Sequence, residues 1–457
     1  MEKTISFLKE HRETYLQELI DFLRIPSISA LSDHKEDIKK AAEWLKNSLE
    51  KAGFEHVQMM PTGGHPVVYA DHLHAEGAPT VLIYGHYDVQ PVDPLPLWQS
   101  PPFEPEIREG RLYARGASDD KGQVFMHIKV LEAILKTEGK LPFNFKVLFE
   151  GEEEIGSAHL DAFVEKNQEL LAADLLVVSD TPMLEKGKPA VCYGLRGLAG
   201  LQIDVKGPKS DLHSGNFGGA VQNPIHALVE LLSSMRDQEG RITIEGFYDR
   251  VKPLSEKERE EFKQLNQDEE RLREELGVPS LFGEKGYTAL ERTWGRPTLE
   301  INGIYGGFQG ERIKTVIPSE AHAKITCRLV PDQEPDEILS LIEKHIADHT
   351  PPGVTVTTTR FDTGRPYMTP IDHPAIHAAS RAYEKAYGVP AAYIRMGGSI
   401  PIVETFVRLL KLPVILMGFG LPNENFHAPN EFFTLENFDK GLDTLAYYWQ
   451  ELKTALS

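Results

Sequence analysis

The stretch TVLIYGH, residues 80–86, is an apolar run that ends in a glycine and a histidine. A pattern typical of an amphipathic helix follows it at 122–137, and two further apolar runs come at 143–151 and 174–180. Continuous runs of Val, Ile and Leu that alternate with helices are typical of a mostly parallel sheet with helices on both faces. The sequence therefore predicts an α/β domain.

A second pattern begins after residue 197. Alternating apolar and polar residues predict strands at LQIDVKG (201–207) and AHAKITCRLVP (321–331), and a helical pattern follows each of them. This arrangement is typical of a smaller α+β domain. The first pattern then resumes, so we expect an α/β domain made of residues 1–197 and 366–457, with an α+β domain inserted at 198–365.

The composition narrows the class of protein. A chain of 457 residues, 41% hydrophobic and 26% charged, is typical of a globular protein with two domains. The net charge of −20 argues against nucleic acid or an anionic membrane as partners, because both require clustered Lys and Arg. The charged stretch 254–277 predicts a solvated helix on the surface of the insert.

We expect a cytoplasmic protein. The N-terminal residues lack the apolar centre of a signal peptide. No apolar stretch approaches the roughly 20 residues that a membrane-spanning helix needs. The two cysteines, Cys192 and Cys327, lie in strand-like apolar surroundings and indicate neither a disulfide framework nor a thiolate metal site.

Histidine and carboxylate side chains follow three of the predicted strands. They are His86 and Asp88 after the first strand, Glu152, Glu153 and Glu154 after the second, and Asp180 after the third. An acidic run such as 152–154 is by itself typical of a solvated surface. Because ligands of such sheets bind beyond the carboxyl ends of the strands, however, we expect these side chains to gather at one edge.

Asp119 and Asp120 stand just before the predicted helix at 122–137. Either aspartate could cap that helix, with Gln123 completing a capping box, or the pair could join the acidic cluster. Carboxylates crowded at a partly buried edge repel one another and protonate unless a cation neutralises them. The pattern therefore favours a metal site.

The residue types indicate which ions would bind. Imidazole and carboxylate without thiolate suit Zn, Mn or Co. Two ions need one bridging carboxylate and about two terminal ligands each, and the residues that can supply them are His86, Asp119, Glu154, Asp180 and His427.

Glu153 then remains free to act as a general base and afterwards as a general acid. Asp88 can accept the ring N–H of His86 and orient the imidazole. Glu152 is expected to point elsewhere, since neighbouring residues of an extended strand alternate between two sides.

The same residues lie in segments that resemble the M20 family of dinuclear metallopeptidases, in particular its dipeptidase branch, which includes the cytosolic nonspecific (carnosine-type) dipeptidases. The matching segments run in order from about residue 80 to 430: YGHYDVQP, LYARGASDDKG, FEGEEEIGS, VSDTP, YGLRG, DLHSG, KTVIP, RLVP, GGSIP and NFHAPNE. The resemblance implies the same metal ligands, with Asp119 as the bridge, Glu153 as the general base and a cis peptide after Asp119.

The resemblance also implies a role for the insert. It would be a lid that dimerises the protein, and His213 would reach the active site of the other subunit and stabilise the oxyanion. Thr315, Arg328 and Ser399 would bind the polar and carboxylate ends of the substrate. Arg328 has an independent reason, because a bidentate guanidinium suits a C-terminal carboxylate.

We therefore predict a catalytic α/β domain with an inserted α+β lid and dimerisation domain. The predicted reaction is hydrolysis of the amide bond of dipeptides by a hydroxide that bridges two divalent ions (Zn or Mn, with Co possible), with Glu153 as the base. The alternative enzyme is an N-acyl amino acid deacylase or desuccinylase that uses the same site. An inactive binding protein is disfavoured because Glu153 and the full ligand set are present. The expected partners are a small peptide and a second copy of the chain.

Overall fold

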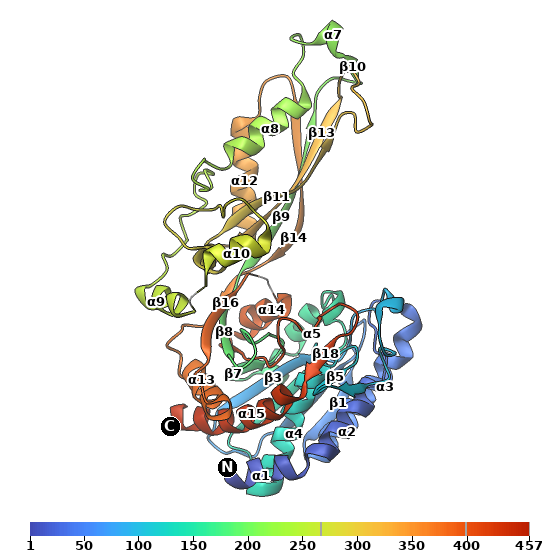
Figure 1. Ribbon diagram of the computed structural model, residues 1–457, viewed down its shortest axis with the longest axis vertical. Coiled ribbons are helices and arrows are strands. Elements are labelled where there is room, and N and C mark those ends of the chain that lie inside the picture. Colours follow the sequence, from blue (N-terminus) through green and yellow to red (C-terminus); the bar gives the residue numbers. More distant parts are fainter. Residues whose placement is uncertain (266, 398–399, 457) are drawn as a thin grey trace. The chain divides into compact units, whose positions relative to one another are not determined.

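The computed structural model describes residues 1–265, 267–397 and 400–456, and the chain divides into two compact units (Figure 1). Unit 1 consists of Met1–Tyr193, Thr369–Ile394 and the chain from Pro401 onward. Unit 2 consists of Gly194–Met368 and Arg395–Ile400. The domain boundaries that the sequence suggests at 198 and 365 stay a prediction.

The main sheet of unit 1 has parallel strands at its centre. In order across the sheet, its strands are β1 (Glu55–Met60), β2 (Val67–His72), β6 (Asn144–Glu150), β3 (Thr80–His86), β7 (Leu175–Val178), β17 (Val414–Leu416), β8 (Ala190–Leu195) and β15 (Tyr367–Met368), and β16 (Ala392–Met396) also pairs with β8. The central strands β6, β3, β7 and β17 pair in parallel, whereas β1, β2 and β8 pair antiparallel at the sides. This confirms the predicted α/β fold with a mostly parallel central sheet.

Helices cover both faces of this sheet. Tyr84 of β3 packs against Phe406 of α14 (Pro401–Leu410) with ring centroids 5.4 Å apart, and Phe145 of β6 packs against Trp449 of α15 (Leu435–Leu456) at 4.9 Å. The parallel register places Phe145 beside Val81, which lies three residues from Tyr84 along β3. Because residues an odd number apart on a strand point to opposite faces, α14 and α15 cover opposite faces of the sheet.

The helices of unit 1 are α1 (Glu2–Glu10), α2 (Arg12–Leu23), α3 (Lys35–Ala52), α4 (Lys121–Glu138), α5 (Leu160–Lys166), α6 (Gln168–Leu171), α13 (Pro374–Tyr387), α14 (Pro401–Leu410) and α15 (Leu435–Leu456). Helix α4 is buried along most of its length because it contacts β3 on one side and α1, α2, α3 and α15 on others. It ends at Gly139, whose φ of +71° is the left-handed conformation that glycine adopts without strain. A small sheet also lies in unit 1, with the order β18 (Phe432–Thr434), β5 (Arg111–Tyr113) and β4 (Glu106–Arg108).

Unit 2 is built on an antiparallel sheet. Its strands, in order, are β11 (Thr298–Gly306), β13 (Glu320–Leu329), β9 (Gly197–Lys206) and β14 (Thr355–Gly364). Alternate residues of β13 are buried, and α8 (Pro224–Ser234) and α12 (Pro335–His349) pack on this sheet to enclose an aliphatic core. The remaining elements of unit 2 are β10 (Leu212–His213), α7 (Ser214–Phe217), α9 (Glu256–Gln264), α10 (Glu269–Leu276), α11 (Ala289–Gly295) and β12 (Val316–Ile317).

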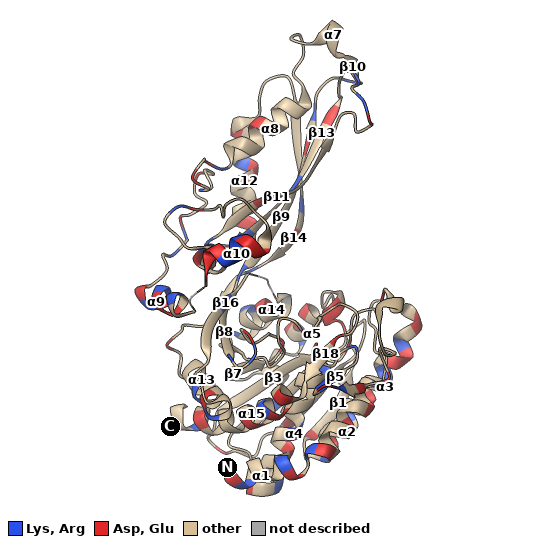
Figure 2. Ribbon diagram, viewed as in Figure 1, with Lys and Arg blue, Asp and Glu red and all other residues tan. Residues whose placement is uncertain are grey.

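The charged stretch 254–277 differs from its prediction as one solvated helix. It forms two helices, α9 and α10, both rich in acidic and basic residues (Figure 2). Each has its own N-cap: the Ser255 hydroxyl accepts from the backbone N–H of Glu258, and Asp268 caps α10 in the same way. Phe262 of α9 is buried, so this helix is anchored by an apolar contact that the charge pattern conceals.

Both cysteines are buried and neither forms a disulfide with another described residue, Cys192 in β8 and Cys327 in β13. None of the helices in the described parts of the chain combines the length and apolar character that crossing a membrane requires.

Candidate metal centre and active site

Three neighbouring strands of unit 1 deliver the candidate side chains to one edge of the sheet. His86 is the last residue of β3, Glu153 and Glu154 lie in a short 3-10 helix (Glu153–Ile155) that follows β6, and Asp180 comes two residues after β7. Since β6, β3 and β7 are adjacent and parallel, their carboxyl ends meet. Asp119 arrives from the loop before α4, and His427 from the loop between β17 and β18.

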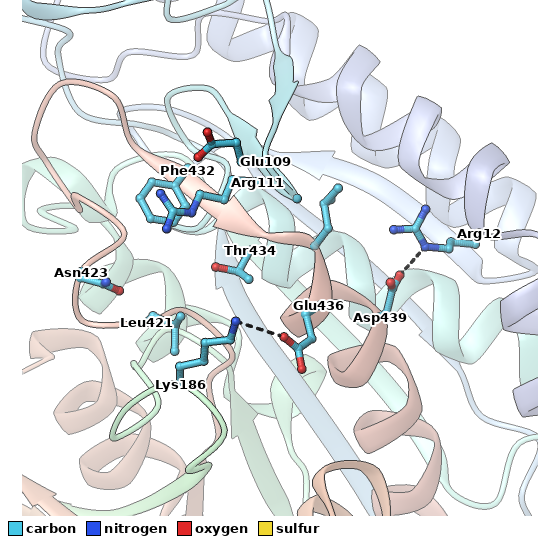
Figure 3. Close-up of a pocket in the computed structure, with 12 residues that line it drawn as sticks. Arg12, Glu109, Arg111, Lys186, Leu421, Asn423, Phe432, Thr434, Glu436 and Asp439 are labelled. Atoms are coloured by element: carbon cyan, nitrogen blue, oxygen red, sulfur yellow. Dashed lines mark hydrogen bonds and ion pairs between the residues drawn. The ribbon is translucent and has the colours of Figure 1, made fainter.

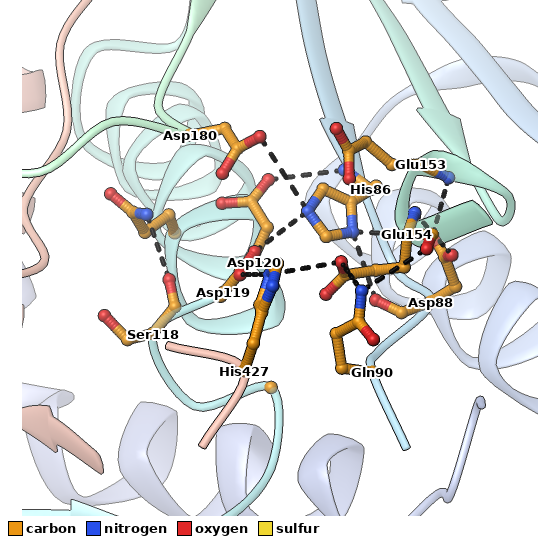
Figure 4. Close-up of polar contacts among 12 residues, drawn as sticks. His86, Asp88, Gln90, Ser118, Asp119, Asp120, Glu153, Glu154, Asp180 and His427 are labelled. Atoms are coloured by element: carbon orange, nitrogen blue, oxygen red, sulfur yellow. Dashed lines mark hydrogen bonds and ion pairs between the residues drawn. The ribbon is translucent and has the colours of Figure 1, made fainter. Parts of the chain in front are cut away.

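Two groups of potential metal ligands share Asp119 (Figure 4). In the first, His86 Nε2 lies 3.1 Å from Asp119 Oδ1 and 3.9 Å from Asp180 Oδ2. In the second, His427 Nε2 lies 2.9 Å from Asp119 Oδ2 and 3.2 Å from Glu154 Oε2. Within each group the ligand atoms are all within 4.8 Å of one another. The structure thus brings together every residue that the sequence suggests as a ligand.

Asp88 is fully buried and holds several parts of the cluster in place. Its two carboxylate oxygens accept the backbone N–H groups of Glu153 at 3.2 Å and Glu154 at 3.1 Å. Oδ1 also lies 3.4 Å from His86 Nδ1, and the backbone oxygen of Asp88 lies 3.1 Å from the same ring nitrogen. Asp88 therefore orients both the imidazole and the two glutamates.

The three consecutive glutamates have three different surroundings. Glu154 belongs to the second ligand group, and Gln90 donates to its Oε2 at 2.8 Å. Glu152 points away from the cluster, where it accepts from the backbone N–H of His65 and contacts the ring of His159. The sequence argument placed Glu152 correctly but for the wrong reason, because the segment turns into a 3-10 helix instead of continuing as a strand.

The capping interpretation of Asp119 and Asp120 is wrong. Asp120 is the N-cap residue of α4 by position, yet its side chain makes no capping hydrogen bond. One of its oxygens accepts from the backbone N–H of His86 at 3.3 Å instead. Gln123 completes no capping box, since it donates to the carbonyl of Ser118. The peptide bond between the two aspartates is cis.

The electrostatics of the cluster favour a bound cation. Burial, reinforced by the charge of neighbouring Asp120, raises the pKa of Asp180 well above its ordinary value. Burial likewise raises the pKa of Glu153 to about 7. The hydrogen bonds to Asp119 and Glu154 raise the pKa of His427 to about 10, so these carboxylates attract positive charge strongly. The donor set of imidazole nitrogens and carboxylate oxygens fits divalent ions such as Zn or Mn.

The residues expected to bind substrate lie in unit 2, and they are not all together. His213 and Thr315 meet where β10 pairs with β12, both exposed, and the backbone N–H of Ser214 donates to the carbonyl of Thr315 at 3.0 Å. Arg328 lies near the opposite end of β13. Ser399 falls outside the described residues.

Sequence reasoning missed other polar residues near these positions. Arg196, half-buried beside Arg328, has an Nη1 atom without a hydrogen-bond partner among the described residues, and burial with the charge of Arg328 lowers its pKa to about 10. Glu431 is buried beside Asp119. Both residues lie inside matching segments, YGLRG and NFHAPNE, and those segments were the signal available.

A pocket of about 520 Å³ elsewhere in unit 1 is a separate feature (Figure 3). Two of its three cations are paired, Arg12 with Asp439 at 2.7 Å and Lys186 with Glu436 at 3.5 Å, while the third, Arg111, lies over the ring of Phe432. Its lining contains no histidine, so it lacks the donor set of the cluster.

A parallel α/β sheet that carries two histidine and carboxylate groups around one shared aspartate defines a metal-dependent hydrolase. The chain belongs to the peptidase family M20/M25/M40, whose family model matches residues 82–451. It is 32% identical to the Cys-Gly metallodipeptidase DUG1 of Saccharomyces cerevisiae over 95% of each chain. It is 31% identical to the human Beta-Ala-His dipeptidase, over 99% of this chain and 92% of that one.

Solved structures agree with this assignment. An M20 family metallo-carboxypeptidase from Sulfolobus solfataricus is 35% identical, covers 96% of this chain and 99% of its own, and superposes with a TM-score of 0.80. The predicted membership of the M20 family and its dipeptidase branch is confirmed, and so is the predicted class of enzyme, a peptidase.

Proposed function

We propose that the protein is a dinuclear metallodipeptidase. The observation that carries this proposal is the pair of ligand groups that share Asp119, with Glu153 beside them and assigned to neither. His86 and Asp180 would hold one divalent ion, Glu154 and His427 the other, and Asp119 both. The relatives named as Cys-Gly and Beta-Ala-His dipeptidases support dipeptides as the substrate class.

Two bound ions would supply Lewis-acid polarisation of the scissile carbonyl and lower the pKa of a water molecule. The protein's own part is to move the proton. The Glu153 carboxylate takes a proton from the attacking water, holds it on an oxygen and passes it to the leaving amine. Asp88 accepts the backbone N–H of Glu153 and so holds the backbone from which the Glu153 side chain extends.

The positions of the residues in unit 2 support a homodimer with shared sites. Arg328 lies eight residues beyond Glu320 along β13, which is roughly 26 Å at 3.3 Å per residue. His213 lies beyond the other end of that strand, since it pairs with Val316. A dipeptide spans only about 7 Å, so one chain cannot place His213 and Arg328 on the same substrate, and His213 would serve the partner's site.

A surface for such a partner is present on unit 2. Strand β11 is at the edge of its sheet, and Ile301 and Ile304 on it are about half exposed, at 49% and 53%. They line a groove with Val229 and Phe282, which are also exposed. Continuation of the sheet by a second copy would cover this edge.

The decisive experiment replaces the base without disturbing the ligands. Glu153→Gln should retain the metal content of the wild type, measured by elemental analysis, and lose turnover of a dipeptide panel in the presence of Zn or Mn. Retained turnover would refute the assignment of the base. The same panel should include N-acetyl and N-succinyl amino acids, because preferential cleavage of these would favour the alternative deacylase.

A hybrid experiment tests the shared site. Mixtures of Glu153→Gln and His213→Ala chains should regain about a quarter of wild-type activity, because random exchange makes half of the dimers hybrid and each hybrid has one intact site. Absence of any recovery from the two inactive variants, with exchange verified by mass, would place His213 in its own chain's site, and an active His213→Ala protein would place it outside catalysis.

A second candidate is removal of C-terminal residues from longer peptides. It is favoured by the 35% identity to the M20 family metallo-carboxypeptidase. Tripeptides and tetrapeptides with free C-termini separate it from strict dipeptidase action. The two buried cysteines, which are not joined in a disulfide, also support the reducing, cytoplasmic location that we propose.

A further inference from the structure

Two buried glutamates flank His427 in the chain and grip the loop that carries Asp119. Glu431, only 1% exposed, accepts hydrogen bonds from four N–H groups. Its Oε1 accepts from the backbone of Ser118 at 3.0 Å and of Asp119 at 3.1 Å. Its Oε2 accepts from Gly116 N at 3.0 Å and from the guanidinium of Arg115 at 2.8 Å.

Glu424 makes a second connection from the other side of His427. It is fully buried, and its Oε2 accepts from the Ser118 hydroxyl at 2.6 Å. Its Oε1 accepts from the backbone N–H and the hydroxyl of Thr434, at 2.9 and 2.6 Å. The loop between β17 and β18 is therefore bonded to the loop before α4 both upstream and downstream of His427.

We propose that Glu431, with Glu424, is a positioning residue that fixes His427 relative to Asp119. This inference rests on the proposed dinuclear site. The His427 side chain is 56% exposed, so little packing holds its ring near Asp119. The backbone N–H of Asp119 itself is bound by Glu431, and charge-assisted bonds of this kind are stronger than neutral ones. The two glutamates thus supply the rigidity that packing does not.

The hydrogen bonds from Glu424 and Glu431 to the loop before α4 form a clamp, and the two ligand groups depend on it unequally. His86 and Asp180 are positioned by β3 and β7 of the central sheet, and Asp88 holds the His86 ring. His427 has no such support from a strand, and its loop is joined to Asp119 through Glu424 and Glu431. Loss of the clamp should therefore weaken the ion at Glu154 and His427 more than the ion at His86 and Asp180.

The test is Glu431→Gln, which keeps the shape but turns one acceptor oxygen into an NH₂ group that faces N–H donors. Metal-stripped protein is titrated with Zn²⁺ in a chelator buffer, and bound zinc is counted by elemental analysis. We expect wild type to bind two ions and the variant to bind one at the same free zinc, with the second bound 10- to 100-fold more weakly, the usual effect of removing a group that orders metal ligands. Turnover should return at high zinc with KM unchanged.

A matched control is Glu152→Gln. Glu152 is also buried and next to the cluster, but its partners, His65 and His159, lie outside it. This variant should be less stable than wild type and bind both ions with unchanged affinity. If Glu431→Gln does not fold, Glu424→Gln replaces it, since Arg115 then keeps its partner.

The outcomes separate the two proposals. A wild type that binds fewer than two ions refutes the dinuclear site itself. A wild type with two ions and Glu431 and Glu424 variants with unchanged zinc affinity refute the clamp alone. Equal weakening of both ions would also refute it, because the proposal requires the ion at His427 to be lost first.

Discussion

Replacement of Asp88 by asparagine should remove a group that positions His86 and the two glutamates while leaving all the candidate metal ligands in the chain. Each Asp88 oxygen accepts one backbone N–H, from Glu153 and from Glu154, in surroundings closed to water. Asparagine keeps one acceptor and places an NH₂ group against the other N–H. The loss of one charge-assisted hydrogen bond in a buried position costs about 1.5–3 kcal/mol. If that cost is felt in the transition state, kcat falls roughly 10- to 150-fold.

The assay is kcat and KM on a cleaved dipeptide at saturating metal, with metal content measured on the same samples. Asp71→Asn is the matched control. Asp71 lies in β2, outside the ligand cluster, and is a buried acceptor for Tyr69 and His56. The control should lose stability and keep kcat. An Asp88→Asn enzyme with full metal and wild-type kcat would refute the orienting role.

Three further results are expected. Burial lowers the pKa of His127 to about 3, so the folded protein excludes a proton that the unfolded chain binds below pH 6.5, and stability is lost as pH falls. Between pH 7.5 and 5, wild type should lose about 2 kcal/mol more unfolding free energy than His127→Gln, measured by urea unfolding. Equal losses in the two proteins would contradict this. Gly418→Ala should lower the free energy of unfolding by at least about 3 kcal/mol or prevent folding, because the new Cβ would lie 1.4 Å from the backbone oxygen of Thr181. A variant with the melting temperature of wild type would show that the contact relaxes. Burial raises the pKa of Cys327 to about 12, and Cys192 is equally buried, so neither thiol should react with a thiol reagent until denaturant is added. Labelling of either cysteine in the native protein would contradict their burial.

The elements at the centre of unit 1 were predictable because their residues are buried on both faces. The apolar run 80–86 coincides with β3, and the helical pattern 122–137 falls inside α4. The short strands β4 and β5, of three residues each, leave no periodicity to detect. The stretch 254–277 was misjudged because charge alone does not reveal a second N-cap.

The residues of the candidate site also differ in how far the sequence alone predicts them. His86, Glu154 and Asp180 lie at the end of a strand or within four residues of it, so the rule for the carboxyl ends of parallel strands locates them. His427 is far from them in the chain and was reached by ligand counting and family resemblance. The role of Glu431 was not predictable, because a carboxylate that binds backbone N–H groups has the same sequence appearance as one exposed to water.

The candidate ligands Asp119 and His427 are separated by 308 residues, with all of unit 2 between them in the chain. At synthesis rates of 5–20 residues per second, a ribosome reaches His427 roughly 15–60 s after Asp119. Once Asp180 has been added, the nascent chain carries four of the five candidate ligands and lacks only His427. The clamp glutamates flanking His427 emerge with it, so the second candidate ligand group can be completed only after all of unit 2 has been synthesised, whereas the first group has all its residues before unit 2 begins.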